Sequence, residues 1–220
     1  RRQRQMCIRD RFIAKSILMA SAYDILHVHG LYKLLPVLKT LYPWKKVVLH
    51  FHGSDIRSKW AKRRKYWRWA DVVLVSSPDL LKSAPEHVIH LPRPVDTELF
   101  RPQRKPESGT ALYIIKHQVG ENLEWVYQIA KRLGLKLTLI DRVKNPIPYK
   151  RMPEILSRYE YYIDRSYIRS LSLTALQALA CGSKVIRWNG KVISGLPEEH
   201  KAENVVKILK NILIERGILD

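Results

Sequence analysis

Cysteine, acidic residues and long apolar runs are all scarce in this 220-residue chain. Its two cysteines, Cys7 and Cys181, lie in unrelated contexts, which excludes a disulfide framework and a zinc ribbon built on cysteine pairs. No apolar run approaches the roughly 20 residues that a membrane-spanning helix needs. The first residues also lack the apolar stretch of a signal peptide. These absences favour a cytoplasmic protein.

The shortage of acidic residues leaves a large positive charge. Only 20 Asp and Glu oppose 40 Lys and Arg, so the formal net charge is +20. This balance predicts an anionic partner, either nucleic acid or an anionic membrane surface. Apolar residues make up 46% of the chain and charged residues 27%, which is the composition of a globular protein and not of a disordered one.

Part of that charge lies in residues 1–11, which hold five arginines. This segment is similar to translated sequencing-adapter read-through, and we expect it to be foreign to the native protein. The alternative is a basic arm that binds nucleic acid. We leave the segment out of the fold prediction.

From Phe12 onward, short apolar runs alternate with longer stretches of helical periodicity, which indicates a parallel α/β protein. The runs are rich in Val, Ile and Leu, as expected of strands covered on both faces. Strands are expected at 25–29, 47–52, 72–76, 88–91, 111–115, 136–141, 161–164 and 184–188, and helices at 31–40, 56–70, 122–133, 171–180 and 203–216. Prolines among charged residues at 92–108 predict a linker, so we place one domain at 12–98 and another at 99–220.

Four segments carry a family resemblance: Asp24-Ile-Leu-His-Val-His-Gly30, Leu49-His-Phe-His-Gly-Ser-Asp55, Leu91-Pro-Arg-Pro-Val-Asp-Thr-Glu-Leu-Phe-Arg-Pro102 and Ala175-Leu-Gln-Ala-Leu-Ala-Cys-Gly-Ser-Lys-Val-Ile186. In this order they resemble the family-4 retaining glycosyltransferases. The resemblance implies the GT-B fold, with two Rossmann-like parallel-sheet domains facing a cleft. It also implies transfer of a hexose from a nucleotide diphosphate sugar to a glycan or lipid-linked acceptor with retention, and no metal or other cofactor.

The resemblance begins late in the family's N-terminal domain. That domain opens with a strand and a Gly-rich turn, and only about a dozen residues between the adapter-like segment and Asp24 are left for them here. We therefore expect the first domain to be truncated and the chain to be a fragment, with an unpaired sheet edge before Ile25. A naturally shortened enzyme is the alternative.

By resemblance, His52 faces the transferred sugar, where it can hydrogen-bond a hydroxyl or stabilise developing charge. Gly53 lets the backbone approach the donor. A strand-end histidine with an ordinary structural hydrogen bond is the other interpretation of His52.

The donor's diphosphate needs cations and N–H donors, and Lys116 stands where the family has an arginine. Ser170 and Ser172, at the start of a predicted helix with Thr174, could supply donors to a phosphate. Gln177 could accept a hydrogen bond from a ribose hydroxyl.

The chain departs from the family at two places. The position of the family's second cation falls at Glu121 or Asn122, with His117 as the nearest substitute. The family's pair of glutamates falls at Gln177 and Arg169, and an arginine accepts no hydrogen bond.

Asp164, at the end of the preceding strand, is then the candidate acid. These departures keep two alternatives open. One is a catalytically impaired sugar-nucleotide or membrane-binding module of the same fold, and the other is a basic nucleic-acid-binding protein.

Four histidines alternate along two predicted strands, at His27, His29, His50 and His52. Residues at i and i+2 of a strand share a face, so a metal cluster is conceivable. No Asp, Glu or Cys follows at metal-site spacing, so we expect no metal site here.

The stretch 57–69 is basic and aromatic. Its candidate membrane or acceptor patch comprises Lys59, Lys62, Arg63, Arg64, Lys65 and Trp67. Basic and aromatic residues together suit the headgroup region of an anionic membrane, which would place the protein at the inner face. A solvated helix with inward-packed aromatics is the equal alternative, and RNA binding is a third.

Overall fold

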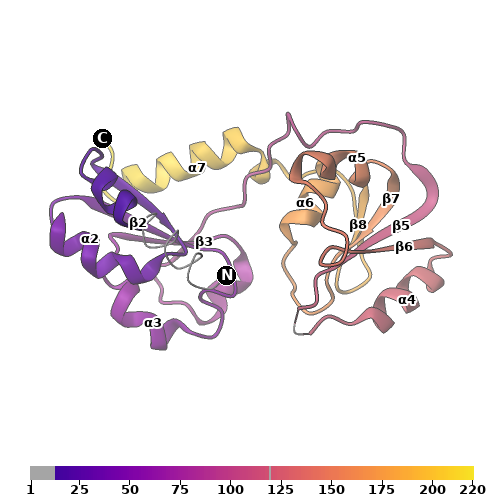
Figure 1. Cartoon of the computed structure of the whole chain (residues 1–220), viewed down its shortest axis with the longest axis horizontal. Coiled ribbons are helices and arrows are strands. Elements are labelled where there is room, and N and C mark those ends of the chain that lie inside the picture. The colour runs from indigo at the N-terminus through magenta and orange to yellow at the C-terminus, as the bar shows by residue number, and fades with distance from the viewer. Residues whose placement is uncertain (1–12, 119) are drawn as a thin grey trace. The chain divides into compact units, whose positions relative to one another are not determined.

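The computed structural model describes residues 13–118 and 120–220 (Figure 1). They divide into two compact α/β units. Unit 1 holds the described residues up to Leu91 together with Leu209–Asp220, and unit 2 holds Pro92–Ile208. The division therefore lies seven residues before the one expected from the sequence, and the end of the chain belongs with unit 1. The adapter-like segment 1–11 lies outside the described residues.

Unit 1 contains a parallel sheet in the order β1-β2-β3-β4. Its elements are β1 (Ile25–His29), α2 (Leu35–Leu41), β2 (Lys46–Phe51), α3 (Trp60–Trp67), β3 (Val72–Val75) and β4 (Ile89–His90), with 3-10 turns at Tyr32–Leu34 and Pro78–Ser83. Residues 13–20 are also helical. Among the described residues β1 pairs only with β2, so its other edge carries no strand.

The two faces of β2 differ. Val47, Leu49 and Phe51 are fully buried and pack with Leu35 and Ile56 in the core of unit 1. Because side chains alternate along a strand, the opposite face of β2 carries His50. The histidine of β2 therefore lies on the face of the sheet opposite to this core.

Unit 2 contains a five-stranded sheet in the order β6-β5-β7-β8-β9, parallel except for β9. Its elements are β5 (Glu107–Ile115), α4 (Leu123–Arg132), β6 (Lys136–Asp141), α5 (Met152–Leu156), β7 (Tyr159–Ile163), α6 (Leu173–Ala180), β8 (Lys184–Ile186), β9 (Val192–Ile193) and α7 (Ala202–Glu215), with 3-10 turns at Tyr149–Arg151 and Glu198–His200. The division between the units passes through α7.

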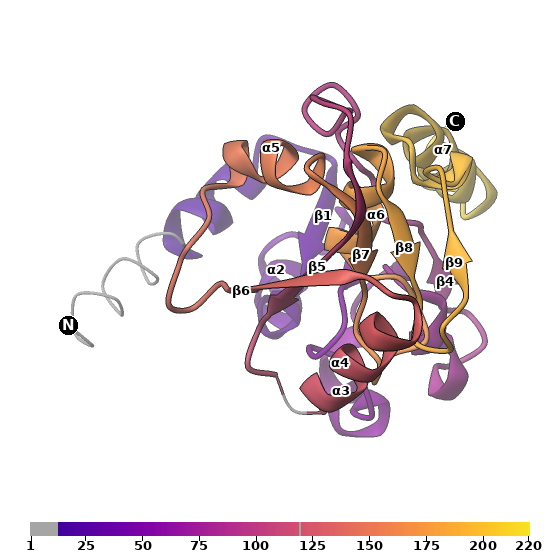
Figure 2. The same cartoon turned by 90° about the vertical axis from the view of Figure 1, so that its right-hand side faces the viewer.

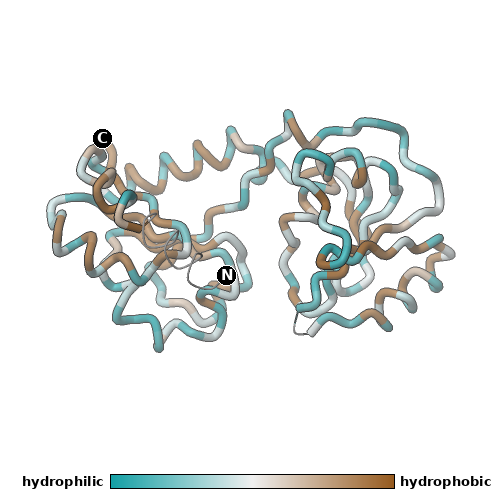
Figure 3. Tube along the Cα trace, viewed as in Figure 1, coloured by the Kyte–Doolittle hydropathy of each residue, from teal (hydrophilic) through white to brown (hydrophobic). Residues whose placement is uncertain are grey.

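The helices of unit 2 cover both faces of its sheet (Figure 2). Helix α4 packs its buried residues, such as Ile129, against the face that carries Ala111 and Tyr113. Helices α5 and α6 pack against the face that carries Leu112 and Ile114. Hydrophobic residues accordingly follow the strands and recur along α4 (Figure 3). The predicted α/β layering is confirmed in this unit.

Some helix and strand boundaries differ from those predicted. Helix α3 begins at Trp60 and not at Ile56, because the preceding residues form turns on the Gly53 carbonyl and Ser58 has a left-handed φ of 55°. Neither α5 nor β9 was predicted, since each is too short to show a period. None of the helices in the described part of the chain has the length and apolar character needed to cross a membrane.

Candidate functional site

Four imidazole rings cluster on one face of unit 1. The β1–β2 register pairs His29 with His50, so these side chains share a face, and alternation adds His27 and His52 to it. Ring centroids lie 4.2 Å apart for His27 and His29, 5.3 Å for His29 and His50, and 4.5 Å for His50 and His52. The structure therefore brings together histidines that lie on two strands.

Hydrogen bonds join three of these rings, those of His29, His50 and His52, with the help of Ser76, which follows β3. His29 Nδ1 lies 3.0 Å from His52 Nε2, and His52 Nδ1 lies 2.5 Å from Ser76 Oγ. The same Oγ lies 3.0 Å from His50 Nε2. Sequence reasoning missed Ser76. Its signal was the position directly after a buried strand, at the carboxyl edge where ligands of parallel sheets bind.

The turn after β2 holds the His52 backbone in place. The Asp55 carboxylate accepts the N–H groups of His52 at 2.9 Å and of Gly53 at 2.6 Å. Gly53 has a φ of +152°, which favours glycine, and a Cβ there would meet no atom within 4 Å. The backbone therefore borders open space, as close approach of a ligand requires. Asp55 was also missed, although an Asp two residues after a glycine is a turn signal.

The two histidines of β1 both have lowered pKa values. Burial lowers the pKa of His27 to about 4, and repulsion from His29 and His52 adds to the effect. Burial also lowers the pKa of His29. Neutral imidazoles offer both a donor and an acceptor nitrogen, which suits recognition of hydroxyl groups.

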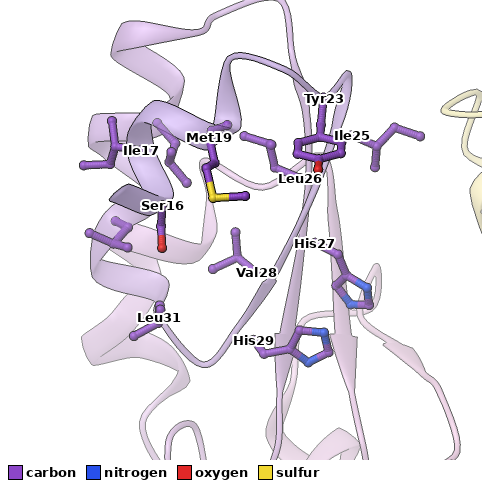
Figure 4. A pocket seen from close by; sticks show the side chains of 13 residues that line it. Ser16, Ile17, Met19, Tyr23, Ile25, Leu26, His27, Val28, His29 and Leu31 are labelled. Carbon is purple, nitrogen blue, oxygen red and sulfur yellow. The ribbon is translucent and has the colours of Figure 1, made fainter. Parts of the chain in front are cut away.

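An apolar groove of about 550 Å³ borders β1 on the side of the helical residues 13–20. Figure 4 shows Met19, Leu26 and Val28 along this groove, with His27 and His29 side by side at one end. The two exposed histidines are therefore accessible to a small ligand.

In unit 2, Lys116 follows β5 and reaches the first turn of α6. Its Nζ lies 3.4 Å from Thr174 Oγ1. Burial lowers the pKa of Lys116, the charges of Arg165 and Arg142 lower it further, and Asp164 acts in the opposite direction. The lysine predicted for the diphosphate thus has two further cations and the Asp164 carboxylate as its charged neighbours.

Arg142 and Arg165 supply positive charge that sequence reasoning had not found. Arg142 directly follows β6, and Arg165 comes two residues after β7. Both strands pair in parallel with β5, so their carboxyl ends and that of β5 share one edge. Both arginines could have been identified from the sequence, because each directly follows a predicted strand.

Ser172 and Asp164 hold the start of α6. Ser172 Oγ accepts the N–H of Ala175 at 3.0 Å, and the Ser172 N–H donates to Asp164 Oδ2 at 2.9 Å. Ser172 and Asp164 are buried, and so is Gln177 one turn further along α6. Ser170, two residues before Ser172, is half-buried. The capping bonds show a structural role for Ser172 and Asp164, and the ligand roles of this group stay predictions.

Side-chain hydrogen bonds hold several residues near Lys116. Glu121 accepts from the Tyr113 hydroxyl at 2.8 Å and from the Lys116 N–H at 3.1 Å. Burial and this contact raise the pKa of Tyr113. Asn122 caps α4, and His117 Nε2 lies 2.9 Å from Asp141 Oδ2. At the positions where the family's second cation is expected, the side chains of Glu121, Asn122 and His117 thus make structural hydrogen bonds.

Arg169, at the position of the family's first glutamate, packs against an aromatic ring. Its guanidinium lies 5.2 Å from the Trp188 ring centroid, and its carbonyl accepts from Arg187 Nη2 at 3.1 Å. This edge of unit 2 is therefore cationic at the place where the family is acidic.

The aromatic residues of α3 mostly pack inward. Trp60 is buried and donates to the Leu80 carbonyl, while Trp67 donates to the Trp60 carbonyl. Arg63 lies over the Tyr32 ring. The basic face that remains exposed consists of Lys59, Lys62, Arg64 and Lys65. Trp60 and Trp67 therefore pack inward, as expected if α3 is a solvated helix with its aromatic residues in the core.

No family model and no curated protein matches the chain. Among solved structures, it is similar to an α-glucosyltransferase in complex with UDP-glucose and DNA containing an abasic site. That match has a TM-score of 0.56 and 15% identity, and covers 94% of this chain and 75% of the other. It is also similar to sucrose-phosphate synthase from Thermosynechococcus elongatus, with a TM-score of 0.50, 15% identity, and coverage of 95% and 69%. These structure neighbours are GT-B glycosyltransferases, and the predicted GT-B class of fold is confirmed.

Proposed function

We propose that this GT-B chain is a glycosyltransferase that moves a hexose from a nucleotide diphosphate sugar to a glycan or lipid-linked acceptor with retention. The observation that carries the proposal is the edge of unit 2 where Lys116 reaches the first turn of α6, while Arg142 and Arg165 follow the strands on either side of β5. A departing diphosphate gains negative charge, which cations and a helix N-terminus stabilise. The α-glucosyltransferase with UDP-glucose supports this choice of donor.

In this proposal unit 2 binds the donor. Lys116 contacts the diphosphate, and Ser170, Ser172 and the first turn of α6 supply hydrogen-bond donors. Gln177 accepts from the ribose. Asp164 is the candidate acid, and it also positions α6 by accepting the Ser172 N–H. The bond from the anomeric carbon to the diphosphate oxygen breaks, and its electron pair leaves with the diphosphate.

Unit 1 contributes His52, which acts on the transferred sugar. Ser76 holds its Nδ1, and its Nε2 contacts the exposed His29. On binding, Nε2 exchanges His29 for a sugar hydroxyl. The acceptor oxygen then bonds to the anomeric carbon on the face that the diphosphate left, and the acceptor's proton leaves with the nucleotide product.

The direct test is to offer the full chain a panel of nucleotide diphosphate sugars, following binding by calorimetry and release of nucleoside diphosphate. One donor is expected to bind, and to release its nucleotide faster when a glycan or lipid-linked acceptor is present. Failure of every nucleotide sugar to bind would contradict the proposal.

The impaired-module alternative makes a different prediction for Gln177. For an enzyme, Gln177→Met should lower kcat/KM by about 10- to 100-fold, because one hydrogen bond to the substrate is worth about 1–3 kcal/mol. For a pure binder, only the dissociation constant should change. Gln128→Met, on the exposed face of α4, is the control for the same substitution away from the proposed site. Arg169→Glu, which restores the family's acidic residue, should raise turnover only if the chain is catalytic.

The exposed basic face of α3 is proposed to bind an anionic membrane that carries the lipid-linked acceptor. Each basic residue near such a surface contributes about 1 kcal/mol, so Lys62→Gln, Arg64→Gln and Lys65→Gln together should weaken vesicle binding by roughly 100-fold. Vesicles containing phosphatidylserine and sedimentation at low and high salt provide the measurement.

The control replaces three exposed basic residues of unit 2: Lys131→Gln, Arg132→Gln and Lys136→Gln. Equal loss in both triple variants would show a dependence on net charge and not on α3. Loss of RNA binding with vesicle binding unchanged would favour the nucleic-acid alternative.

A further inference from the structure

The sequence predicted no metal site at the alternating histidines, but their positions in the structure lead us to propose that His27, His29 and His50 form a binding site for a divalent transition-metal ion such as Zn²⁺. One nitrogen from each of these three side chains lies within 4.8 Å of the other two. Neutral imidazole nitrogen is a preferred ligand of such ions. The site is separate from the donor-binding residues of unit 2 and stands whether or not the chain transfers a sugar.

Two adjacent strands place the three ligands. The parallel register sets His29 opposite His50, and the two-residue repeat of β1 sets His27 on the same face. Zn–N bonds of about 2.0–2.1 Å in a tetrahedral site put ligand nitrogens about 3.4 Å apart. The ligand nitrogens therefore need to approach one another by up to about 1.4 Å, a movement of the size that side-chain rotation allows.

The hydrogen bonds around the rings are compatible with a metal. If His50 binds through Nδ1, its Nε2 carries the hydrogen and donates to Ser76 Oγ, 3.0 Å away. The Ser76 hydroxyl donates to the Phe51 carbonyl at 3.3 Å, so its lone pairs remain for His50 and His52. If His29 binds through Nε2, its Nδ1–H donates to His52 Nε2 at 3.0 Å. Two of the three ligands thus have the outer partners that orient metal-binding histidines.

The site is accessible and leaves room for a further ligand. His27 and His29 line the groove beside β1, which provides an entry path (Figure 4). The nearby Asp55 carboxylate already accepts the N–H groups of His52 and Gly53. A three-histidine site would keep a fourth position for water or an exogenous ligand, as open zinc sites do. A bound ion would join β1, an edge strand among the described residues, to β2.

The test uses the untagged full chain after treatment with a chelator. Titration with Co²⁺ is expected to produce the visible ligand-field bands of a low-coordinate site and to saturate at one equivalent, and Zn²⁺ should abolish the bands. Zn²⁺ should also raise the unfolding temperature, because it binds the folded state. Absence of the Co²⁺ bands together with an unchanged unfolding temperature in Zn²⁺ would overturn the proposal.

Variants assign the ligands. His27→Gln and His50→Gln should each weaken Zn²⁺ binding on the order of 100-fold. His27 is exposed, so its variant keeps the test valid if the buried His50 variant fails to fold. His87→Gln, at a histidine that packs against Trp67 outside the cluster, should leave the affinity unchanged. Equal affinities for the His27 and His87 variants would overturn the proposal, and neither result depends on sugar transfer.

Discussion

Lys116→Met is expected to lower turnover of the nucleotide sugar by about 10²- to 10³-fold, the usual effect of removing one group that stabilises charge in a transition state. Methionine keeps the length of the side chain and removes its charge. Lys116 is the cation that contacts α6 at Thr174, so the remaining arginines cannot take its place at the same point. Initial rates at saturating acceptor, with donor affinity measured separately, give the comparison.

The matched control is Lys136→Met, at the exposed start of β6 and therefore at the opposite edge of the same sheet. It should leave both rate and affinity within a factor of about two, as surface substitutions usually do. Loss of Lys116 removes a positive charge that interacts with the buried Asp164, so circular dichroism must show that the variant is folded. A folded Lys116→Met variant with normal turnover would exclude this lysine from the donor site.

His52→Gln is expected to lower turnover by about 10²-fold or more, within the range found for groups that transfer protons or stabilise charge. Glutamine retains polarity but does not reproduce the two-nitrogen geometry that joins His29 to Ser76. Because His52 is exposed, its replacement should change the free energy of unfolding little.

Ser76→Ala separates a direct role of His52 from a positioning role of its neighbour. Loss of the Ser76 hydroxyl removes its hydrogen bond to His52 Nδ1 but leaves the ring, so a smaller fall in kcat and a shifted pH–rate profile are expected. His87→Gln serves as the control for loss of an imidazole elsewhere in unit 1. Normal rates for His52→Gln would support the interpretation of His52 as a structural strand-end residue.

Several elements were predictable because their signals are local. The run Val72–Val75 is a buried strand by composition alone, and Asn122 precedes a helix in the manner of an N-cap. Other signals were present but overlooked. Asn189-Gly190 is a hairpin turn, and the structure pairs β8 with β9 across it.

The sequence by itself determined the order of strands and helices and the resemblance to GT-B enzymes. Apolar periodicity and short motifs depend only on residues that are close together in the sequence. Only the tertiary structure decided which residues meet. Ser76 joins His50 and His52, and Arg165 lies in the field of Lys116, because parallel strands distant in sequence end at the same edge of a sheet. Burial likewise decided that Trp60 and Trp67 face inward while the lysines of α3 stay in solvent. Such pairings depend on register and packing, which no local pattern specifies.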